Sequence, residues 1–241
     1  MKHSRQMIIA GPMPILIAAF LVMIFTVPCW GGGLEYYQKG RAEEKAGNRL
    51  GAIKSYSLAI QAGDISKDKL AYIYHRRASI RGFFGQSSLG ISDYSKSIEL
   101  NPRSGTSYSL RGYLLGVLGE YDLAQRDHLA AKALSEYSTW DSYLPWVLQH
   151  YADLWRRKGH YEKALEYCDK ALKVKPYATV YFRRAWIYSN MGQYPLVRVE
   201  FEKFKKAMEK QKVSFNVFWA DERAAIERLK VVSQSGQAFP R

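Results

Sequence analysis

Histidine and cysteine, the residue types that most often carry catalysis or bind metal ions, are few and scattered in this chain. They are His3, His75, His128, His150, His160, Cys29 and Cys168. None of the histidines has a carboxylate or cysteine neighbour at the spacing that a metal site needs. The sequence also lacks a glycine-rich phosphate loop, a dinucleotide-binding fingerprint, Gly-x-Ser-x-Gly and His-Glu-x-x-His. We therefore expect no catalytic residue, metal, cofactor or small-molecule substrate.

Three arginines are each followed, sixteen positions later, by an acidic residue. The pairs are Arg77 with Asp93, Arg111 with Asp127, and Arg184 with Glu200. At the two equivalent places of the chain, Lys39 with Ser55 and Tyr151 with Tyr167, neither partner is present. Because an arginine occurs only where an acid accompanies it, we predict ion pairs that bridge two neighbouring helices, and bidentate geometry would favour them. These six residues are expected to be structural and not partner-binding.

The helices that would hold these pairs repeat along the chain. Five glycines each separate two aromatic-rich helical patterns, at intervals of 38, 34, 40 and 33 residues. They are Gly47, Gly85, Gly119, Gly159 and Gly192. A small residue precedes each glycine by seven positions and allows two helices to approach closely: Gly40, Ala78, Gly112, Ala152 and Ala185. Such a period is typical of stacked helical hairpins, so we predict an all-α fold of about five hairpins.

The segment 157–176, RKGHYEKALEYCDKALKVKP, resembles the tetratricopeptide repeat family. The resemblance covers roughly residues 33–210 and implies a right-handed superhelical solenoid of about five helix hairpins. The repeats that it implies span residues 33–66, 71–104, 105–138, 145–177 and 178–211, within a repeat domain of residues 33–212.

One more helix pattern follows Lys212. Its apolar residues recur at i, i+3, i+4 spacing, and the residues between them are mostly charged. The apolar positions are Phe215, Phe218, Trp219, Ile226 and Leu229, and the polar ones include Asp221 and Glu222. An array of hairpins must cover its last exposed core face, so residues 213–232 are expected to form a capping helix. Residues 233–241 are expected to form a flexible tail.

The N-terminus has the pattern of a targeting segment, assigned to residues 1–32. Lys2 and Arg5 precede an apolar stretch of 21 residues, 7–27, that contains a clean run of 13 residues, 15–27. The shorter run has the length of a signal-peptide core, and the longer one could span a bilayer. Positive charge before the stretch predicts export of the body. We therefore expect a periplasmic or secreted protein, or one anchored in the membrane by residues 7–28.

The chain is strongly basic. Its formal net charge is +14, and Lys2 and Arg5 are the only charged residues among the first 33, so the body carries +12. Such a surplus favours acidic partners or anionic surfaces. Export and the absence of a basic run argue against nucleic acid.

The resemblance also implies that the first helix of each hairpin lines a concave face, where the family binds peptides or partner helices. The predicted partner-binding residues are Tyr37, Arg41, Tyr72, His75, Arg76, Ser79, Tyr113, Trp146, Gln149, His150, Arg156, Arg183, Trp186 and Asn190. Aromatic residues beside arginines suit an extended, acidic or aromatic peptide. About half of the aromatics are expected to pack between neighbouring repeats instead, Phe83, Phe182 and Trp186 most of all.

These observations favour a non-catalytic scaffold or adaptor for protein partners. The alternative is binding of a non-protein polyanion, such as an anionic lipid or a glycan, through the basic surface. An enzyme with a site assembled from distant residues is a third hypothesis, but the sequence nominates no residue for it.

Overall fold

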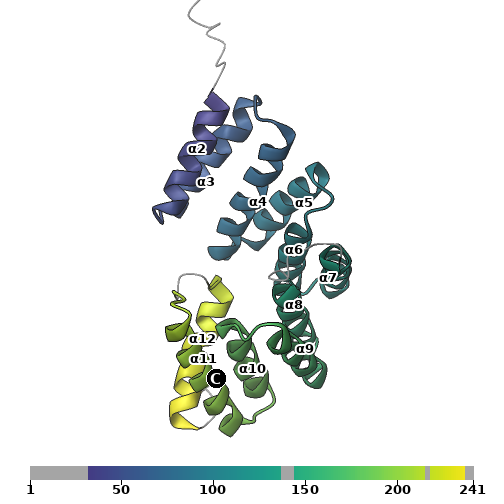
Figure 1. Ribbon diagram of the computed structural model, residues 1–241, viewed down its shortest axis with the longest axis vertical. Helices are drawn as coiled ribbons and strands as arrows, with labels where there is room; N and C mark the ends of the chain where they lie inside the picture. The colour runs from purple at the N-terminus through teal and green to yellow at the C-terminus, as the bar shows by residue number, and fades with distance from the viewer. Residues whose placement is uncertain (1–31, 137–143, 215–217, 237–241) are drawn as a thin grey trace, which may run out of the picture.

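The computed structural model describes residues 32–136, 144–214 and 218–236, and all eleven of the elements in these ranges are α-helices (Figure 1). The expected leader, residues 1–32, lies outside the described ranges except for Gly32, where the first helix begins. None of the helices described combines the length and the apolar character needed to cross a membrane.

Ten of the helices pair as five consecutive hairpins. The hairpins are α2 (Gly32–Lys45) with α3 (Arg49–Ala62), α4 (Lys67–Phe83) with α5 (Ser87–Leu100), α6 (Gly105–Val117) with α7 (Tyr121–Glu136), α8 (Leu144–Arg157) with α9 (Tyr161–Val174), and α10 (Ala178–Asn190) with α11 (Tyr194–Lys210). Each helix packs most extensively on its partner, and the first helices α4, α6, α8 and α10 also contact one another in series. The predicted all-α fold of helix hairpins is confirmed.

The glycine between the two helices of each hairpin makes the reversal possible. All five have a positive φ, between 71° and 85°, a left-handed conformation that only glycine adopts without strain. After Gly85, for example, the N–H of Gln86 donates to the carbonyl of Arg81 at 2.9 Å, which closes the end of α4. In each hairpin the second helix then begins at the second residue after the glycine.

Small residues at the predicted positions set the distance between the paired helices. A Cβ added to Gly112 would lie 2.8 Å from the ring of His128 and 3.0 Å from the carbonyl oxygen of Ala124. A Cβ on Gly40 would lie 2.7 Å from the buried ring of Tyr56. In both hairpins the bare backbone of the first helix therefore receives a ring from the second.

The arginine–acid pairs lie inside their hairpins. Arg77 donates to both carboxylate oxygens of Asp93, at 2.8 and 2.7 Å, and Arg111 does the same to Asp127 at 2.7 and 2.8 Å. Each arginine also reaches the preceding hairpin, as when Arg77 donates to Ser57 at 2.8 Å. The pairs thus join helices within a hairpin and connect neighbouring hairpins.

The third pair is looser. Arg184 lies 3.5 Å from Glu200, and it makes a closer ion pair of 2.7 Å with Asp169 on the preceding hairpin. The nearest cation to Glu200 is Lys203, at 2.8 Å.

The last helix, α12 (Ala220–Ser235), covers the end of the array. Phe218, Ile226 and Leu229 are buried in one cluster with Phe182 and Phe204 of the last hairpin. The helix extends three residues into the expected tail, 233–241, and it begins later than the expected cap, 213–232. Its N-terminal end also reaches a distant hairpin: Arg223 donates to the carbonyl of Phe83, at the end of α4, at 3.1 Å (Figure 1). The capping helix therefore also crosses the inner side of the curved array.

Candidate binding groove

The inner face of the array is formed by the first helices of the hairpins. Figure 1 shows α4, α6 and α8 nearer to α12 than their partners α5, α7 and α9, which lie on the outer side. We call the part formed by α2 and α4 the open end of this face. The part formed by α6, α8 and α10, against which the first turn of α12 lies, is called the filled end.

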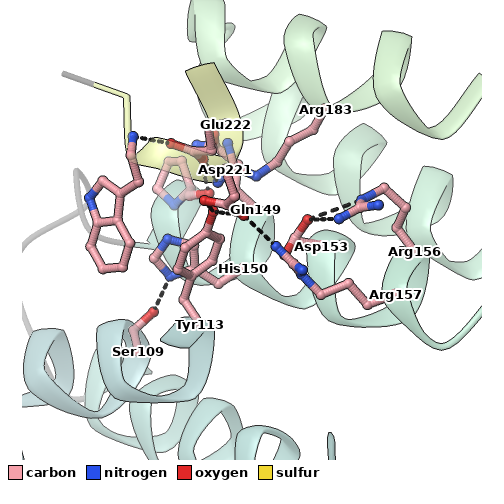
Figure 2. Close-up of polar contacts among 12 residues, drawn as sticks. Ser109, Tyr113, Gln149, His150, Asp153, Arg156, Arg157, Arg183, Asp221 and Glu222 are labelled. Atoms are coloured by element: carbon pink, nitrogen blue, oxygen red, sulfur yellow. Dashed lines mark hydrogen bonds and ion pairs between the residues drawn. The ribbon is translucent and has the colours of Figure 1, made fainter. Parts of the chain in front are cut away.

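At the filled end, acidic side chains of α12 meet basic and phenolic groups of the inner face (Figure 2). Tyr113 on α6 donates to Asp221, with oxygen–oxygen distances of 2.9 and 3.0 Å. Arg157 on α8 donates to Asp221 at 2.6 Å, and Arg183 on α10 donates to Glu222 at 2.7 Å. Two predicted partner-binding residues, Tyr113 and Arg183, thus contact the protein's own helix.

Asp153 organises the arginines of α8. Arg156 donates two hydrogen bonds to one carboxylate oxygen, at 3.0 and 2.8 Å, and Arg157 donates to the other at 2.5 Å (Figure 2). Burial alone would raise the pKa of Asp153, but the charges of Arg156, Arg157 and Arg183 outweigh it and hold the pKa well below its usual value. The carboxylate therefore stays charged and fixes both arginines of the last turn.

Arg156 is shared with the next hairpin. Its guanidinium lies 3.7 Å from the ring centroid of Trp186, a cation–π contact, and the residue is buried. Trp186 also packs against Phe182 at 5.4 Å between ring centroids. These side chains pack between repeats, as the sequence analysis allowed for Phe182 and Trp186.

Two further predicted partner-binding residues of α8 are buried in the interior. Gln149 donates to the carbonyl of Pro145 at 3.1 Å, and the ring of His150 lies 2.6 Å from the hydroxyl of Ser109. Burial holds the pKa of His150 well below its usual value, so the ring is neutral. Neither side chain is available to a partner in this structure.

The open end carries the predicted basic and aromatic residues on its surface. The rings of Tyr37 and Tyr72 meet edge to face at 6.0 Å, and the guanidinium of Arg41 lies 5.7 Å from the ring centroid of Tyr37. Arg76 forms an ion pair with Glu44, and its side chain is 35% exposed. Tyr72 is 40% exposed. These five residues form a basic–aromatic cluster that no described part of the chain covers.

A depression of about 350 Å³ adjoins this cluster. Its lining residues are Asp68, Ala71, Tyr72, His75, Arg76, Ser97, Asn101, Ser104 and Thr106. His75 accepts from or donates to the hydroxyl of Ser107 at 2.9 Å, and burial lowers its pKa to about 4. The cluster thus borders a cavity with a polar wall.

The remaining predicted residues belong neither to the basic–aromatic cluster nor to the polar contacts with α12 described above. Ser79 is half-buried on α4, and Asn190 is exposed at the end of α10. Trp146 packs on Tyr177 at 5.4 Å, beside a larger depression of about 820 Å³. Four lysines from other elements also line that depression: Lys175, Lys203, Lys206 and Lys210. This site was not predicted from the sequence, because three of its lysines lie on a second helix, α11.

Trp219, Asp221 and Glu222 were predicted only as part of a capping helix, and their contacts with the inner face were not predicted. Their spacing indicates an aromatic helix start followed by two acids, a pattern equally expected for an ordinary helix N-terminus. Only the contacts of these residues with α4, α6, α8 and α10 distinguish a segment bound to the inner face from an ordinary helix N-terminus.

Comparisons with known proteins agree with this architecture. A family model described as Tetratricopeptide repeat matches residues 147–177. Among solved structures, PilF from Pseudomonas aeruginosa is 16% identical with a TM-score of 0.56, covering 83% of this chain and 89% of its own. MamA from Desulfovibrio magneticus RS-1 is 14% identical with a TM-score of 0.54, covering 76% and 97%. A tetratricopeptide repeat protein from Parabacteroides merdae ATCC 43184 is 16% identical with a TM-score of 0.52, covering 91% and 90%.

No curated protein matches the sequence significantly. The paired helices, the turn glycines and the matching repeat together define the class: an α-helical repeat protein whose units are helix hairpins. Residues 147–177 match the tetratricopeptide repeat, and the fold of the array is similar to that of solved tetratricopeptide repeat structures.

Proposed function

We propose that this chain is a non-catalytic scaffold that binds a peptide or a partner protein on the inner face of a right-handed superhelix. Repeat arrays of this kind present extended surfaces built from many first helices, and the fold is usually non-catalytic. The proposal places the contact at the open end, because the filled end already contacts α12.

One observation carries the proposal: in the basic–aromatic cluster, Arg41 and Tyr72 are exposed and Tyr37 and Arg76 are half-buried, beside a polar depression. Aromatic rings and arginines are the side chains that contribute most to binding at protein interfaces. Among the described residues no carboxylate pairs with Arg41, so an acidic group of a partner could pair with it. An acidic or aromatic peptide therefore fits this surface best.

The test is capture of a partner by the purified chain, with membranes and soluble extract of the source cells as separate inputs. The variant Arg41→Glu with Tyr72→Ala should lose the captured protein. The matched control is Arg126→Glu, because Arg126 is exposed on α7, a helix of the outer side. If both variants retain the same partner as the unchanged chain, binding at the open end is refuted.

The proposed location is outside the cytoplasm, either as a released protein or as one anchored by residues 7–28. Lys2 and Arg5 before the apolar stretch 7–27 support this proposal. A fusion of alkaline phosphatase to the C-terminus, active only after export, tests it. N-terminal sequencing of the mature protein then separates a cleaved leader from an anchor.

A second candidate function, binding of a polyanion, is favoured by the lysines around the larger depression. Lys203, Lys206 and Lys210 succeed one another on α11, and Trp146 and Tyr177 provide an apolar wall. Such a surface suits an anionic lipid headgroup or a glycan. Binding to vesicles that contain anionic lipid should fall steadily with salt, and Lys206→Glu with Lys210→Glu should abolish it. Binding that is equal for neutral and anionic vesicles would count against this function.

A further inference from the structure

The first turn of α12 is held by four helices that are distant in the sequence. The ring of Trp219 packs edge to face on Tyr113 at 4.7 Å and lies on Gly82, where an added Cβ would be 2.9 Å from the ring. Asp221 and Glu222 then reach α6, α8 and α10 (Figure 2). One short segment thus contacts α4, α6, α8 and α10, in the way that a bound peptide contacts a repeat array.

The chemistry of the two sides is complementary. The inner face contributes the guanidinium groups of Arg157 and Arg183, and α12 contributes the carboxylates of Asp221 and Glu222. The apolar side of α12 makes a separate contact, because Ile226 and Leu229 pack on the last hairpin. Phe218, just before the first turn, is buried in the same cluster, so the acidic turn can leave the inner face by unwinding between Phe218 and Ile226 while the rest of the helix stays attached to the last hairpin.

The fit of this segment is incomplete at Arg183. Its Nη2 donates to a single oxygen of Glu222, while its buried Nε and Nη1 have no partner among the residues described. The other oxygen of Glu222 accepts from the backbone N–H of Trp219, where it caps the helix. A carboxylate without a capping role could bind the guanidinium through two parallel hydrogen bonds, which are stronger.

We propose that the first turn of α12 is an internal ligand of the inner face, and that the partner of this protein displaces it with the same chemistry. The partner is then a protein segment with an aromatic residue followed, two and three positions later, by two acids. The inference rests on the proposed function and deepens it, because it adds the filled end to the surface that a partner can use.

A tethered ligand competes with a free one through its high local concentration. The first test therefore weakens the tethered ligand in the full-length chain, by Asp221→Lys with Glu222→Lys. These changes place positive charges against Arg157 and Arg183. The probe is a fluorescently labelled synthetic peptide of residues 214–236, titrated against each chain and followed by anisotropy. We expect the variant to bind the peptide roughly ten-fold tighter, or more, than the unchanged chain.

Two controls separate this effect from general electrostatics. Glu209→Lys with Glu227→Lys changes the net charge by the same amount at exposed positions, and it should leave the affinity unchanged. The second control is a peptide that carries Asp221→Asn and Glu222→Gln, titrated against the Asp221→Lys, Glu222→Lys chain. It should bind that chain at least roughly ten-fold more weakly than the unchanged peptide does. Circular dichroism establishes that each variant is folded.

The second test locks the segment in place and does not depend on those variants. A Cβ added to Gly85 would lie 3.6 Å from the Cβ of Ala220, within the range that a disulfide spans. We therefore expect Gly85→Cys with Ala220→Cys, in a Cys29→Ser background, to form a disulfide; the remaining thiol, Cys168, is buried. The oxidised chain should bind the peptide at least roughly ten-fold more weakly than the same chain does after reduction. Gly85→Cys alone is the control for strain at that glycine.

Equal peptide binding by the oxidised and reduced chains would overturn the internal-ligand proposal, and so would the absence of peptide binding to every variant. Neither result bears on capture of a partner at the open end, which the Arg41 and Tyr72 variant tests. A partner captured equally by the locked and reduced chains would retain the scaffold function and refute the internal ligand.

Discussion

Arg183 on α10 donates a hydrogen bond to Glu222 on α12 across 2.7 Å, and the side chains are only 4% and 9% exposed. The two residues are 39 positions apart and join the last hairpin to the helix that crosses the inner face. Burial raises the pKa of Glu222, and Arg183 opposes that rise. The pair therefore depends on both of its charges for its stability.

Replacing Arg183 with methionine should destabilise the protein by roughly 3 kcal/mol, because Glu222 would remain buried without its partner. Adding Glu222→Gln should recover part of that loss, since glutamine is neutral and can still accept from the N–H of Trp219. Urea unfolding of both single variants and the double variant measures the coupling. Losses that simply add would show that the pair contributes nothing beyond its separate residues.

The ion pairs within hairpins should differ sharply from those on the surface. Asp93 accepts hydrogen bonds from Arg77 and Arg81 and is 4% exposed, so Asp93→Asn should cost about 3 kcal/mol. Glu99, paired with Lys96 on the same helix, is 65% exposed, so Glu99→Gln should cost less than about 0.5 kcal/mol. Thermal unfolding compares the two. Similar changes in melting temperature would mean that the buried pair is not structural.

The hairpins were predictable because their signals are local. The turn glycines recur at a nearly constant interval, and each is needed where the chain reverses with a positive φ. Two arginine–acid pairs at a spacing of sixteen lie across their hairpins as the spacing indicated. Arg184 differs because Asp169, on the preceding hairpin, is closer to it than Glu200 is. A fixed spacing within one repeat cannot show a competing partner from another repeat.

The filled end was not predictable from the same signals. Tyr113 and Asp221 are 108 positions apart, and Phe83 and Arg223 are 140 apart. Such contacts leave no periodic pattern, because they occur once in the chain and join elements that do not repeat. The interpretation of Asp221 as a polar residue of a capping helix followed from periodicity alone. Its position against Arg157 depends on the curvature of the whole array.

Two glycines of α6, four positions apart, provide a matched test of helix contact. A Cβ at Gly112 would clash with His128 and with the backbone of Ala124, so Gly112→Ala should cost roughly 1–3 kcal/mol. A Cβ at Gly116 would meet its nearest atom, on Arg157, at an ordinary 3.7 Å. Gly116→Ala should therefore be neutral or stabilise the helix by up to about 1 kcal/mol. Denaturant midpoints of the two variants decide this, and equal midpoints would show that the close approach at Gly112 does not matter.

His128 should make the stability of the protein depend on pH. The side chain is 1% exposed, and burial lowers its pKa to about 4, while Asp153 acts weakly in the opposite direction. His150 and Tyr151 of α8 face its ring at 6.0 and 5.3 Å. Between pH 6.5 and 4 the unfolded chain therefore binds a proton that the folded chain excludes. Stability should fall as the pH falls through this range, by up to about 1.4 kcal/mol per unit from this residue.

The variant His128→Phe removes this titration and keeps a ring in the space beside Gly112. Its free energy of unfolding should fall less steeply between pH 6.5 and 5 than that of the unchanged chain, when both are measured by urea unfolding at several pH values. His160→Phe is the control, because His160 is exposed at the start of α9 and contacts only the edge of Trp155 among the rings described. Since His150 remains buried in both variants, some pH dependence should persist in each. Parallel curves for the unchanged chain and His128→Phe would mean that the folded protein already accepts a proton at His128.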